Sequence, residues 1–190
     1  ADRLVRIPEG VSDQSAATLM LKGLTVQYLF RQTSKLKAGD TILFHAAAGG
    51  VGLIACQWAR VLGVTMIGTV GSDEKGELAK AHGCDEIIFY RPEDVAARVK
   101  ELTQGEGVQT VFDGVGKDTY EGSLKSLRRR GMLVACGTAS GPFPPIDAFQ
   151  TMLQGSTYFT RPAFAAYYAD PVEWAELSHF WFSNLAAGKI

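Results

Sequence analysis

The 190-residue sequence is poor in the side chains that bind metals or form disulfides. Its three cysteines, Cys56, Cys84 and Cys136, are scattered along the chain, and no two of them form a C-x-x-C pair. The three histidines are equally dispersed, so no metal centre is predicted. A few isolated cysteines suit a reducing compartment, and the expected location is therefore the cytoplasm.

The sequence also lacks long apolar runs and an excess of charge of either sign. It contains no stretch of about 18 apolar residues and no charged-then-apolar leader, so no membrane partner is expected. Nineteen Lys and Arg residues face twenty Asp and Glu residues, which gives a net charge of −1. Such a balance argues against a surface built to hold nucleic acid.

What the sequence does have is a regular alternation of short apolar segments with segments of helical periodicity. The apolar segments are rich in Val, Ile and Leu without strict alternation, as in strands that are buried on both faces. A strand followed by a helix, repeated, is typical of a doubly wound α/β (Rossmann) fold with a parallel sheet and helices on both faces. We predict about six strands in the order 3-2-1-4-5-6. They are expected at residues 41–46, 64–70, 86–90, 108–113, 132–138 and 156–162.

Helices are predicted between these strands and at both ends of the chain. The first begins after Ser12 or Asp13 and is expected to be kinked or split at Gly23. The helix after the fourth strand is expected to end on the arginines from Arg128 to Arg130, where cations complement the helix dipole. The predicted helices cover residues 13–33, 53–63, 72–82, 92–103, 118–130 and 171–187.

The turn between the first strand and the next helix contains the smallest residues of the chain. Residues 45–52 read HAAAGGVG, and residues 47–52 match G-x-G-x-x-G with alanine in the first place. In this context Gly49 would let the backbone approach a pyrophosphate, and Gly52 would let the helix lie close to the strand. The first N–H groups of the helix, together with its dipole, would then hold the phosphate charge. The alternative is a tight strand-to-helix turn with no ligand.

The end of the second strand indicates which dinucleotide would bind. NAD-binding folds place an acidic residue there for the ribose hydroxyls, whereas this sequence has Gly71 or Ser72. Lys75 follows within reach and Tyr90 ends the neighbouring strand, so a lysine and two hydroxyls surround a small residue. This pattern favours NADPH. The acidic residues 73–74 argue against NADPH unless they only complement the helix dipole. Lys75 could equally be a solvated surface lysine.

Several strings of the sequence resemble those of one enzyme family. The runs MLKGLTVQYL, LFHAAAGGVG, ACQWAR, IGTV, FDGVG and YFTRP are similar to bacterial NADPH:quinone reductases, and the likeness extends over essentially all 190 residues. These enzymes form part of the zinc-free, zeta-crystallin-like branch of the medium-chain dehydrogenase/reductase superfamily. The resemblance implies an oxidoreductase that transfers a hydride from NADPH to a quinone.

The resemblance also implies which residues bind the cofactor. The pyrophosphate would lie at Gly49 to Val51, and Val115 would line the crevice for the ribose and nicotinamide. Thr25 and the segment 137–140 would lie near the nicotinamide, although this chain has Cys136 where the family usually has an aromatic residue. No catalytic residue is assigned. The expected cofactor-binding residues are Thr25, Gly49, Gly50, Val51, Gly52, Gly71, Ser72, Lys75, Tyr90, Val115, Gly137 and Thr138.

By the same resemblance, the sequence is expected to be part of a longer two-domain enzyme. It begins ADRLVRIPEG without methionine, and complete family members carry a second, substrate-facing lobe. Residues 1–190 would form a single dinucleotide-binding domain, with residues 1–35 as the crossover segment and leading helix. Without the substrate lobe, the isolated chain is expected to bind the cofactor but to reduce quinones weakly or not at all.

Other functions stay open at this point. A reductase of enones or enoyl thioesters would use the same cofactor, and most of the acceptor pocket that separates the two activities lies outside this chain. A non-catalytic module, crystallin-like or RNA-binding, is the alternative of another class, and the near-neutral charge argues against RNA binding. Asp113, which ends the fourth strand, is interpreted as a turn-forming residue rather than a general base.

The sixth strand is expected to lie at an edge of the sheet. An open edge that carries Tyr158 and Phe159 would pair readily with a second copy of the chain. The quinone reductases that the sequence resembles are homodimers joined through this domain. A homodimer through residues 156–161 is therefore predicted.

Overall fold

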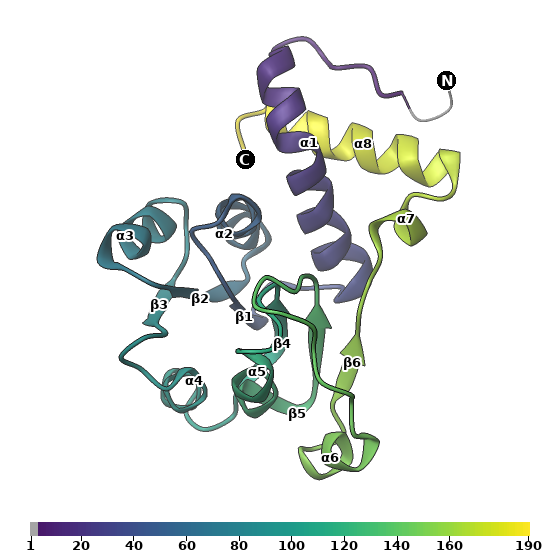
Figure 1. Cartoon of the computed structure of the whole chain (residues 1–190). Coiled ribbons are helices and arrows are strands. Elements are labelled where there is room, and N and C mark those ends of the chain that lie inside the picture. Colours follow the sequence, from purple (N-terminus) through teal and green to yellow (C-terminus); the bar gives the residue numbers. More distant parts are fainter. Residues whose placement is uncertain (1–3) are drawn as a thin grey trace. The chain divides into compact units, whose positions relative to one another are not determined.

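The computed structural model describes residues 4–190, which form two compact units (Figure 1). Leu36–Arg161 form one unit, and the chain up to Lys35 forms the other together with Pro162–Ile190. Residues 1–3 of the predicted crossover segment lie outside the described residues. No helix among the described residues is long and apolar enough to cross a membrane.

A six-stranded sheet forms the centre of the unit Leu36–Arg161. Its strands are all parallel and follow the order β3-β2-β1-β4-β5-β6, which confirms the predicted fold class and strand order. Strands β3 and β6 are the two edges of this sheet. The strands are β1 Thr41–Phe44, β2 Thr65–Val70, β3 Glu86–Phe89, β4 Val108–Asp113, β5 Leu127–Ala135 and β6 Tyr158–Thr160.

Helices cover both faces of this sheet, with α2 and α3 on one face and α4 and α5 on the other (Figure 1). On the α4 and α5 face, Leu43 is in register with Ile67 and with Val111, and all three are buried in one core with Val99 of α4 and Leu124 of α5. A sheet packed on both faces needs apolar residues at successive strand positions, which explains the continuous apolar runs of the sequence. The helices of this unit are α2 Gly50–Leu62, α3 Asp73–Ala81, α4 Val95–Leu102, α5 Tyr120–Ser126 and α6 Ala148–Leu153.

Two helices of this unit begin at residues whose side chains cap the first turn. The Ser72 hydroxyl accepts the N–H of Lys75 at 3.4 Å and so begins α3, where the sequence predicted it. The Asp94 carboxylate accepts the N–H of Ala97 at 3.0 Å and begins α4, three residues after the predicted start at residue 92. Asp94 is a better N-cap than the residues before it, because its carboxylate can bind an N–H group of the first turn.

The prediction of a helix over residues 118–130 is wrong for its last four residues. Helix α5 ends at Ser126, and Arg128 to Arg130 are exposed residues of β5. The chain leaves the helix because Leu127 pairs with Val108 of β4, after which the register between the two strands shifts. Arg130 has a left-handed backbone with φ of 57°, which no regular helix contains. The segment after β5 runs into α6, which the sequence analysis did not predict.

The other unit pairs the two terminal segments of the chain. Helix α1, Asp13–Tyr28, begins at the Ser12 cap and continues into a π-helical turn at Leu29–Thr33. It runs through Gly23 without a break, so the predicted split at that residue is wrong. A Cβ on Gly23 would collide with the ring of Trp181, so the glycine makes room for a close helix contact. The remaining helices are α7 Phe164–Tyr167 and α8 Pro171–Ala186, and α8 matches the predicted final helix.

Candidate functional site

The glycine turn joins β1 to α2. Gly49 is the N-cap of α2 and has an extended backbone, with φ of −79° and ψ of 168°. A Cβ on Gly52 would collide with the carbonyl oxygens of Ala46 and Ala47, so only glycine allows the helix to lie this close to the end of the strand. Ala46 itself has φ of 56°, an unusual value for a residue with a side chain, which the sequence pattern did not reveal.

This turn presents backbone donors for an anion. The N–H groups of Gly50, Val51 and Gly52 are the first of α2, where no preceding helical carbonyl can accept them. No side chain among residues 4–190 caps this helix, and both Gly49 and Gly50 are exposed. The positive end of the helix dipole adds to these donors, so the turn can hold a phosphate or pyrophosphate group.

A cavity of about 460 Å³ opens at the carboxyl ends of the first four strands. In open parallel sheets this edge, at the point where the strand order reverses, is where ligands bind. Here β1 lies between β2 and β4, so the reversal falls beside the glycine turn. The cavity is lined by His45, Ala46, Thr69, Tyr90, Glu93, Val95, Val115, Asp118, Thr119 and Gly122.

Four residues predicted for the adenosine end come from the ends of β2 and β3. Gly71 directly follows β2, and a Cβ there would lie 2.7 Å from the Tyr90 hydroxyl. Tyr90 is 50% exposed and lines the cavity. Ser72 and the exposed Lys75 lie at the start of α3. The Ser72 hydroxyl accepts an N–H of its own helix, so this oxygen already has one partner before any ligand binds.

Three predicted residues come from the loops after β4 and β5. Val115 lines the same cavity as Tyr90, and its predicted place at the ribose and nicotinamide stays a prediction. Gly137 lies against Gly114, since a Cβ on Gly137 would be 2.5 Å from the Gly114 carbonyl oxygen. Thr138 follows it and is exposed. The two loops are joined by the Ser140 N–H, which donates to the Val115 carbonyl at 2.8 Å.

Thr25 belongs to the other compact unit. It lies on α1, where it is half-buried and its hydroxyl donates to the Leu21 carbonyl at 2.8 Å. Its predicted contact with the nicotinamide stays a prediction.

A chain of buried hydrogen bonds lies beneath the cavity, and the sequence analysis missed it. The Asp113 carboxylate accepts the Ser123 hydroxyl at 2.6 Å, so Ser123 has its oxygen free to accept from His45 Nε2 at 3.0 Å. His45 Nδ1 then accepts the hydroxyl of Thr69 at 3.1 Å, and the Thr69 oxygen accepts the Ala46 N–H at 3.3 Å. A neutral imidazole with its proton on Nε2 satisfies every member of this chain.

Asp113 is the centre of this network. Besides Ser123, its carboxylate accepts the N–H groups of Val115 and Gly116 at 2.9 and 3.0 Å and the hydroxyl of Thr119 at 2.8 Å. It is completely buried. The interpretation of Asp113 as a turn-forming residue agrees with these contacts, because it fixes the loop that carries Val115. One signal could have revealed the network: His45, Thr69 and Asp113 all lie at carboxyl ends of adjacent strands, which meet at one edge.

Burial makes the stability of the protein depend on pH through His45. Desolvation lowers the pKa of His45 below its usual 6.5, and the nearby Asp113 opposes that shift only in part. Below about pH 6.5 the unfolded chain takes up a proton at this position that the folded chain does not. The contribution of neutral His45 to stability is therefore fully present above that pH and is lost as the pH falls below it. Protonation of Nδ1 would also remove the acceptor of the Thr69 hydroxyl.

We therefore expect the free energy of unfolding to fall between about pH 7 and about pH 5.5, by up to about 1.4 kcal/mol per pH unit from this residue. The measurement is urea unfolding at several pH values, for the native chain and for His45→Gln. The difference between the two curves should shrink as the pH falls. Two parallel curves would contradict a role for His45 in this dependence.

Cys56 and Cys136 are not poised for nucleophilic chemistry. Cys56 is buried, and its contact with the Cys84 thiol, together with burial, raises its pKa. Burial and the neighbouring Asp113 raise the pKa of Cys136 to about 12. Both thiols therefore stay protonated at neutral pH. Among residues 4–190, no group of three or more His, Cys, Asp or Glu side chains is placed to hold a metal ion.

Comparison with known proteins assigns the chain to a family. A family model described as zinc-binding dehydrogenase matches residues 50–180, from the start of α2 into α8. The chain belongs to the zinc-binding dehydrogenase family. Its curated relatives include a quinone oxidoreductase of Pseudomonas aeruginosa, which is 50% identical over 189 residues. They also include a 2-haloacrylate reductase of a Burkholderia species, which is 46% identical over 193 residues.

These family members are longer than the chain. The match covers 100% of this chain but 58% of each of those two relatives. A crystal structure of an Escherichia coli quinone oxidoreductase complexed with NADPH superposes with a TM-score of 0.96 at 46% identity, and it too is covered over 58% of its length. The zinc-binding dehydrogenase chain described here thus spans little more than half of the proteins that it resembles.

Proposed function

We propose that this chain is the NADPH-binding part of a longer, two-domain quinone reductase of the zinc-free, zeta-crystallin-like branch. The observation that carries the proposal is the glycine turn with free helix N–H groups beside the cavity, at the point where the strand order reverses. The similarity to quinone oxidoreductases, one of them solved with NADPH, supports the choice of cofactor and acceptor. The three free cysteines suit a reducing compartment such as the cytoplasm.

The residues of the site fit such a cofactor. The N–H groups of residues 50–52 would bind the pyrophosphate, and the adenosine end would enter the cavity beside Tyr90, with Val115 beside the ribose and nicotinamide. Gly71 leaves no carboxylate where an NAD-binding fold would have one, and a side chain at this position would displace the Tyr90 hydroxyl. Lys75 and Tyr90 would bind the 2′-phosphate.

When bound, the cofactor would supply a hydride from C4 of its nicotinamide. The quinone would take up this hydride and a proton to give the hydroquinone, and NADP⁺ would be released. The contribution of this chain is to hold and orient the dinucleotide, since no side chain of the site has the arrangement of a general acid or base for the acceptor. Gly137 and Thr138, on the loop after β5, would lie nearest the nicotinamide.

The role of Lys75 gives a direct prediction. We expect Lys75→Ala to weaken NADPH binding about tenfold and to leave NADH binding within about twofold, because the lysine would contact only the 2′-phosphate. Isothermal calorimetry with both cofactors measures this difference. Lys80→Ala, an exposed lysine of the last turn of the same helix, is the matched control and should change neither affinity. Equal losses for both cofactors would assign Lys75 no part in selecting NADPH.

The test of the reaction needs the full-length protein with its substrate lobe. It should oxidise NADPH in the presence of 1,4-benzoquinones with saturation, whereas the 190-residue chain should bind NADPH without saturable turnover. Robust quinone reduction by the 190-residue chain would contradict the proposal that residues 1–190 are a cofactor domain that needs the missing lobe.

Reduction of an activated carbon–carbon double bond is the second candidate. The 2-haloacrylate reductase is 46% identical to the chain, the same value as for the quinone oxidoreductase 1 of Escherichia coli. The same cofactor site serves both reactions, so acceptor choice would be made by the substrate lobe. Assay of the full-length protein with a benzoquinone, a 2-haloacrylate and an enone separates them by the ratio of kcat/KM values.

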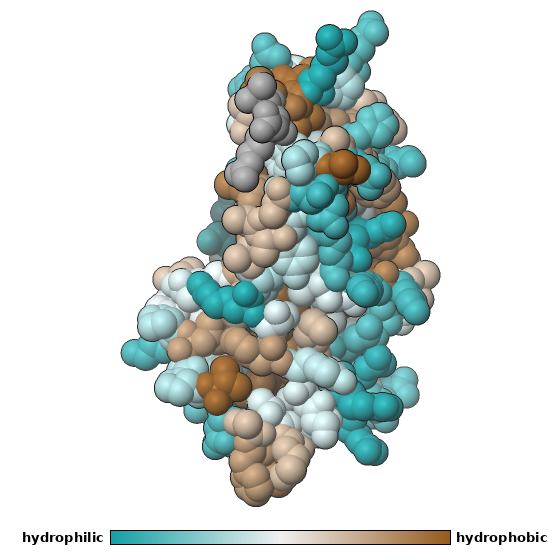
Figure 2. Space-filling model, turned by 90° about the vertical axis from the view of Figure 1, so that its right-hand side faces the viewer, coloured by the Kyte–Doolittle hydropathy of each residue, from teal (hydrophilic) through white to brown (hydrophobic). Residues whose placement is uncertain are grey.

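We also propose that the chain forms a homodimer through the β6 edge. Strand β6 pairs only with β5, and Tyr158 on it is exposed. Next to it, Phe149, Met152 and Leu153 of α6 expose apolar side chains, and Figure 2 shows apolar residues gathered at the lower end of this face, where α6 lies. An open edge beside apolar residues favours strand pairing with a second copy. A monomeric mass by sedimentation at micromolar concentration would contradict it.

A further inference from the structure

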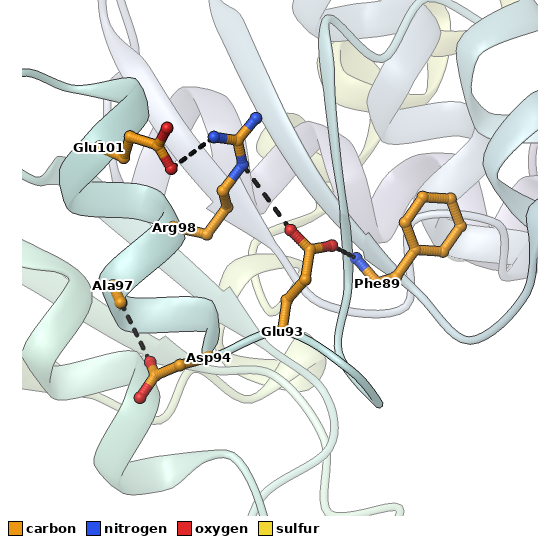
Figure 3. A network of polar contacts seen from close by, with 6 residues as sticks. All are labelled: Phe89, Glu93, Asp94, Ala97, Arg98 and Glu101. Carbon is orange, nitrogen blue, oxygen red and sulfur yellow. Dashed lines mark hydrogen bonds and ion pairs between the residues drawn. The ribbon is translucent and has the colours of Figure 1, made fainter.

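The turn that carries Tyr90 is closed by Glu93. The Glu93 carboxylate accepts the N–H of Phe89 at 2.6 Å (Figure 3). The N–H of Glu93 in turn donates to the carbonyl of Phe89 at 3.1 Å. These two reciprocal bonds join the first and last residues of the segment 89–93. Tyr90 lies inside the closed segment and is further held by its N–H, which donates to the Val70 carbonyl at 3.2 Å.

The position of β3 explains why Phe89 needs a side-chain partner. β3 is an edge strand that pairs only with β2, so every second N–H of the strand faces away from the sheet. Tyr90 donates to β2, and its neighbour Phe89 therefore points its N–H to the open side. Glu93 satisfies that donor at the last residue of the strand, which fixes the direction in which the chain leaves β3.

Glu93 also lines the cavity, where a free carboxylate would repel a phosphate. Its second oxygen lies 3.7 Å from Nε of Arg98, whose Nη1 lies 2.5 Å from the carboxylate of Glu101 (Figure 3). Arg98 is on α4, so the helix places a cation beside the carboxylate and reduces its negative field. Both oxygens of Glu93 thus have partners in the protein, and the side chain acts on the segment rather than on a ligand.

We propose that Glu93 is a positioning residue that sets the preference of the site for a dinucleotide with a 2′-phosphate. By closing the segment 89–93, it holds the Tyr90 hydroxyl beside Gly71, in the space that a side chain at position 71 would need. Arg98 supports it by pairing with the same carboxylate. This inference rests on the proposed NADPH site, and it identifies the contact that holds Tyr90 in position there.

The test compares two substitutions of the same residue by calorimetry with NADPH and NADH. Glu93→Ala removes the acceptor of the Phe89 N–H and should weaken NADPH binding about tenfold while NADH binding changes less than about threefold. Glu93→Gln keeps an oxygen for that N–H and should stay within about threefold of the native chain for both cofactors. The amide of Phe89 should exchange its hydrogen faster in Glu93→Ala and not in Glu93→Gln.

A double-mutant cycle with Tyr90→Phe separates positioning from a general structural effect. If Glu93 acts through the tyrosine, Glu93→Ala should add little to the loss already caused by Tyr90→Phe. Glu101→Gln removes only the outer partner of Arg98 and serves as the control, with unchanged affinities.

Three results would overturn the inference. Additive losses in the cycle would mean that Glu93 does not act through Tyr90. A Glu93→Ala chain with a lower melting temperature but an unchanged ratio of NADPH to NADH affinity would make Glu93 a structural residue only. A native chain without any preference for NADPH would overturn the proposed cofactor site together with this inference, whereas a native preference that survives in Glu93→Ala overturns the inference alone.

Discussion

Replacement of Asp113 by alanine should lower the free energy of unfolding by about 4 kcal/mol. The completely buried carboxylate accepts two backbone N–H groups and two hydroxyls, and alanine would leave these donors without their charged acceptor. Each buried donor that loses a charged partner costs about 1 to 3 kcal/mol, and some of them can find replacements, such as the Gly116 carbonyl for the Thr119 hydroxyl. The loss should be measured by urea unfolding near neutral pH.

Two further variants make this prediction specific. Asp113→Asn keeps the size of the side chain but turns one oxygen into a donor that faces other donors, so most of the loss should remain. Asp118→Ala removes an exposed carboxylate five residues along the chain and should change stability by less than about 0.5 kcal/mol. A loss below about 1 kcal/mol in Asp113→Ala would show that the network contributes little to stability.

Alanine at Gly23 should destabilise the protein by about 3 kcal/mol, although alanine is the better helix former. Gly23 lies inside α1, and an added Cβ would occupy the position of the Trp181 ring. Trp181 is completely buried on α8, so the ring would have to leave its site and the two helices would separate. The cost approaches that of removing a buried tryptophan from a core, which is about 3 to 5 kcal/mol.

The same substitution in another helix provides the control. Gly122 lies within α5, and a Cβ there would meet nothing within 4 Å. Gly122→Ala should therefore raise the free energy of unfolding by about 0.5 to 1 kcal/mol, the ordinary helix-propensity gain. Opposite signs for the two glycines are the expected result of urea unfolding. An increase in both would show that α1 can shift away from Trp181 at little cost.

The fold could be predicted from the sequence because its signals are local. Apolar runs of four to six residues mark β1, β2 and β4, and capping residues such as Ser72 mark the starts of helices. The strand order then follows from the general rules for connecting parallel strands. The small residues of HAAAGGVG likewise located the turn between β1 and α2, because close approach of backbones requires them.

Features that depend on distant partners do not show in local sequence patterns. The segment from Leu127 to Arg130 has the composition of a helix end, yet Leu127 pairs with Val108 and draws the chain into β5. The hydrogen-bond network of Thr69, His45 and Asp113 joins residues that are far apart in the sequence. Thr69 lies 24 positions and Asp113 lies 68 positions after His45, so no local pattern shows the network. Glu93 lies only three residues after Tyr90, but its role depends on β3 being an edge strand with an open N–H.

The most direct test of the central claim is a calorimetric titration of the native 190-residue chain with NADPH and, in parallel, with NADH. The account predicts that both cofactors bind at one site per chain and that NADPH binds about tenfold more tightly, because only NADPH carries the 2′-phosphate for Lys75 and Tyr90. Equal or reversed affinities would contradict the assignment of Gly71, Ser72, Lys75 and Tyr90 as a 2′-phosphate site. Absence of binding by either cofactor would contradict the claim that this chain alone holds the dinucleotide.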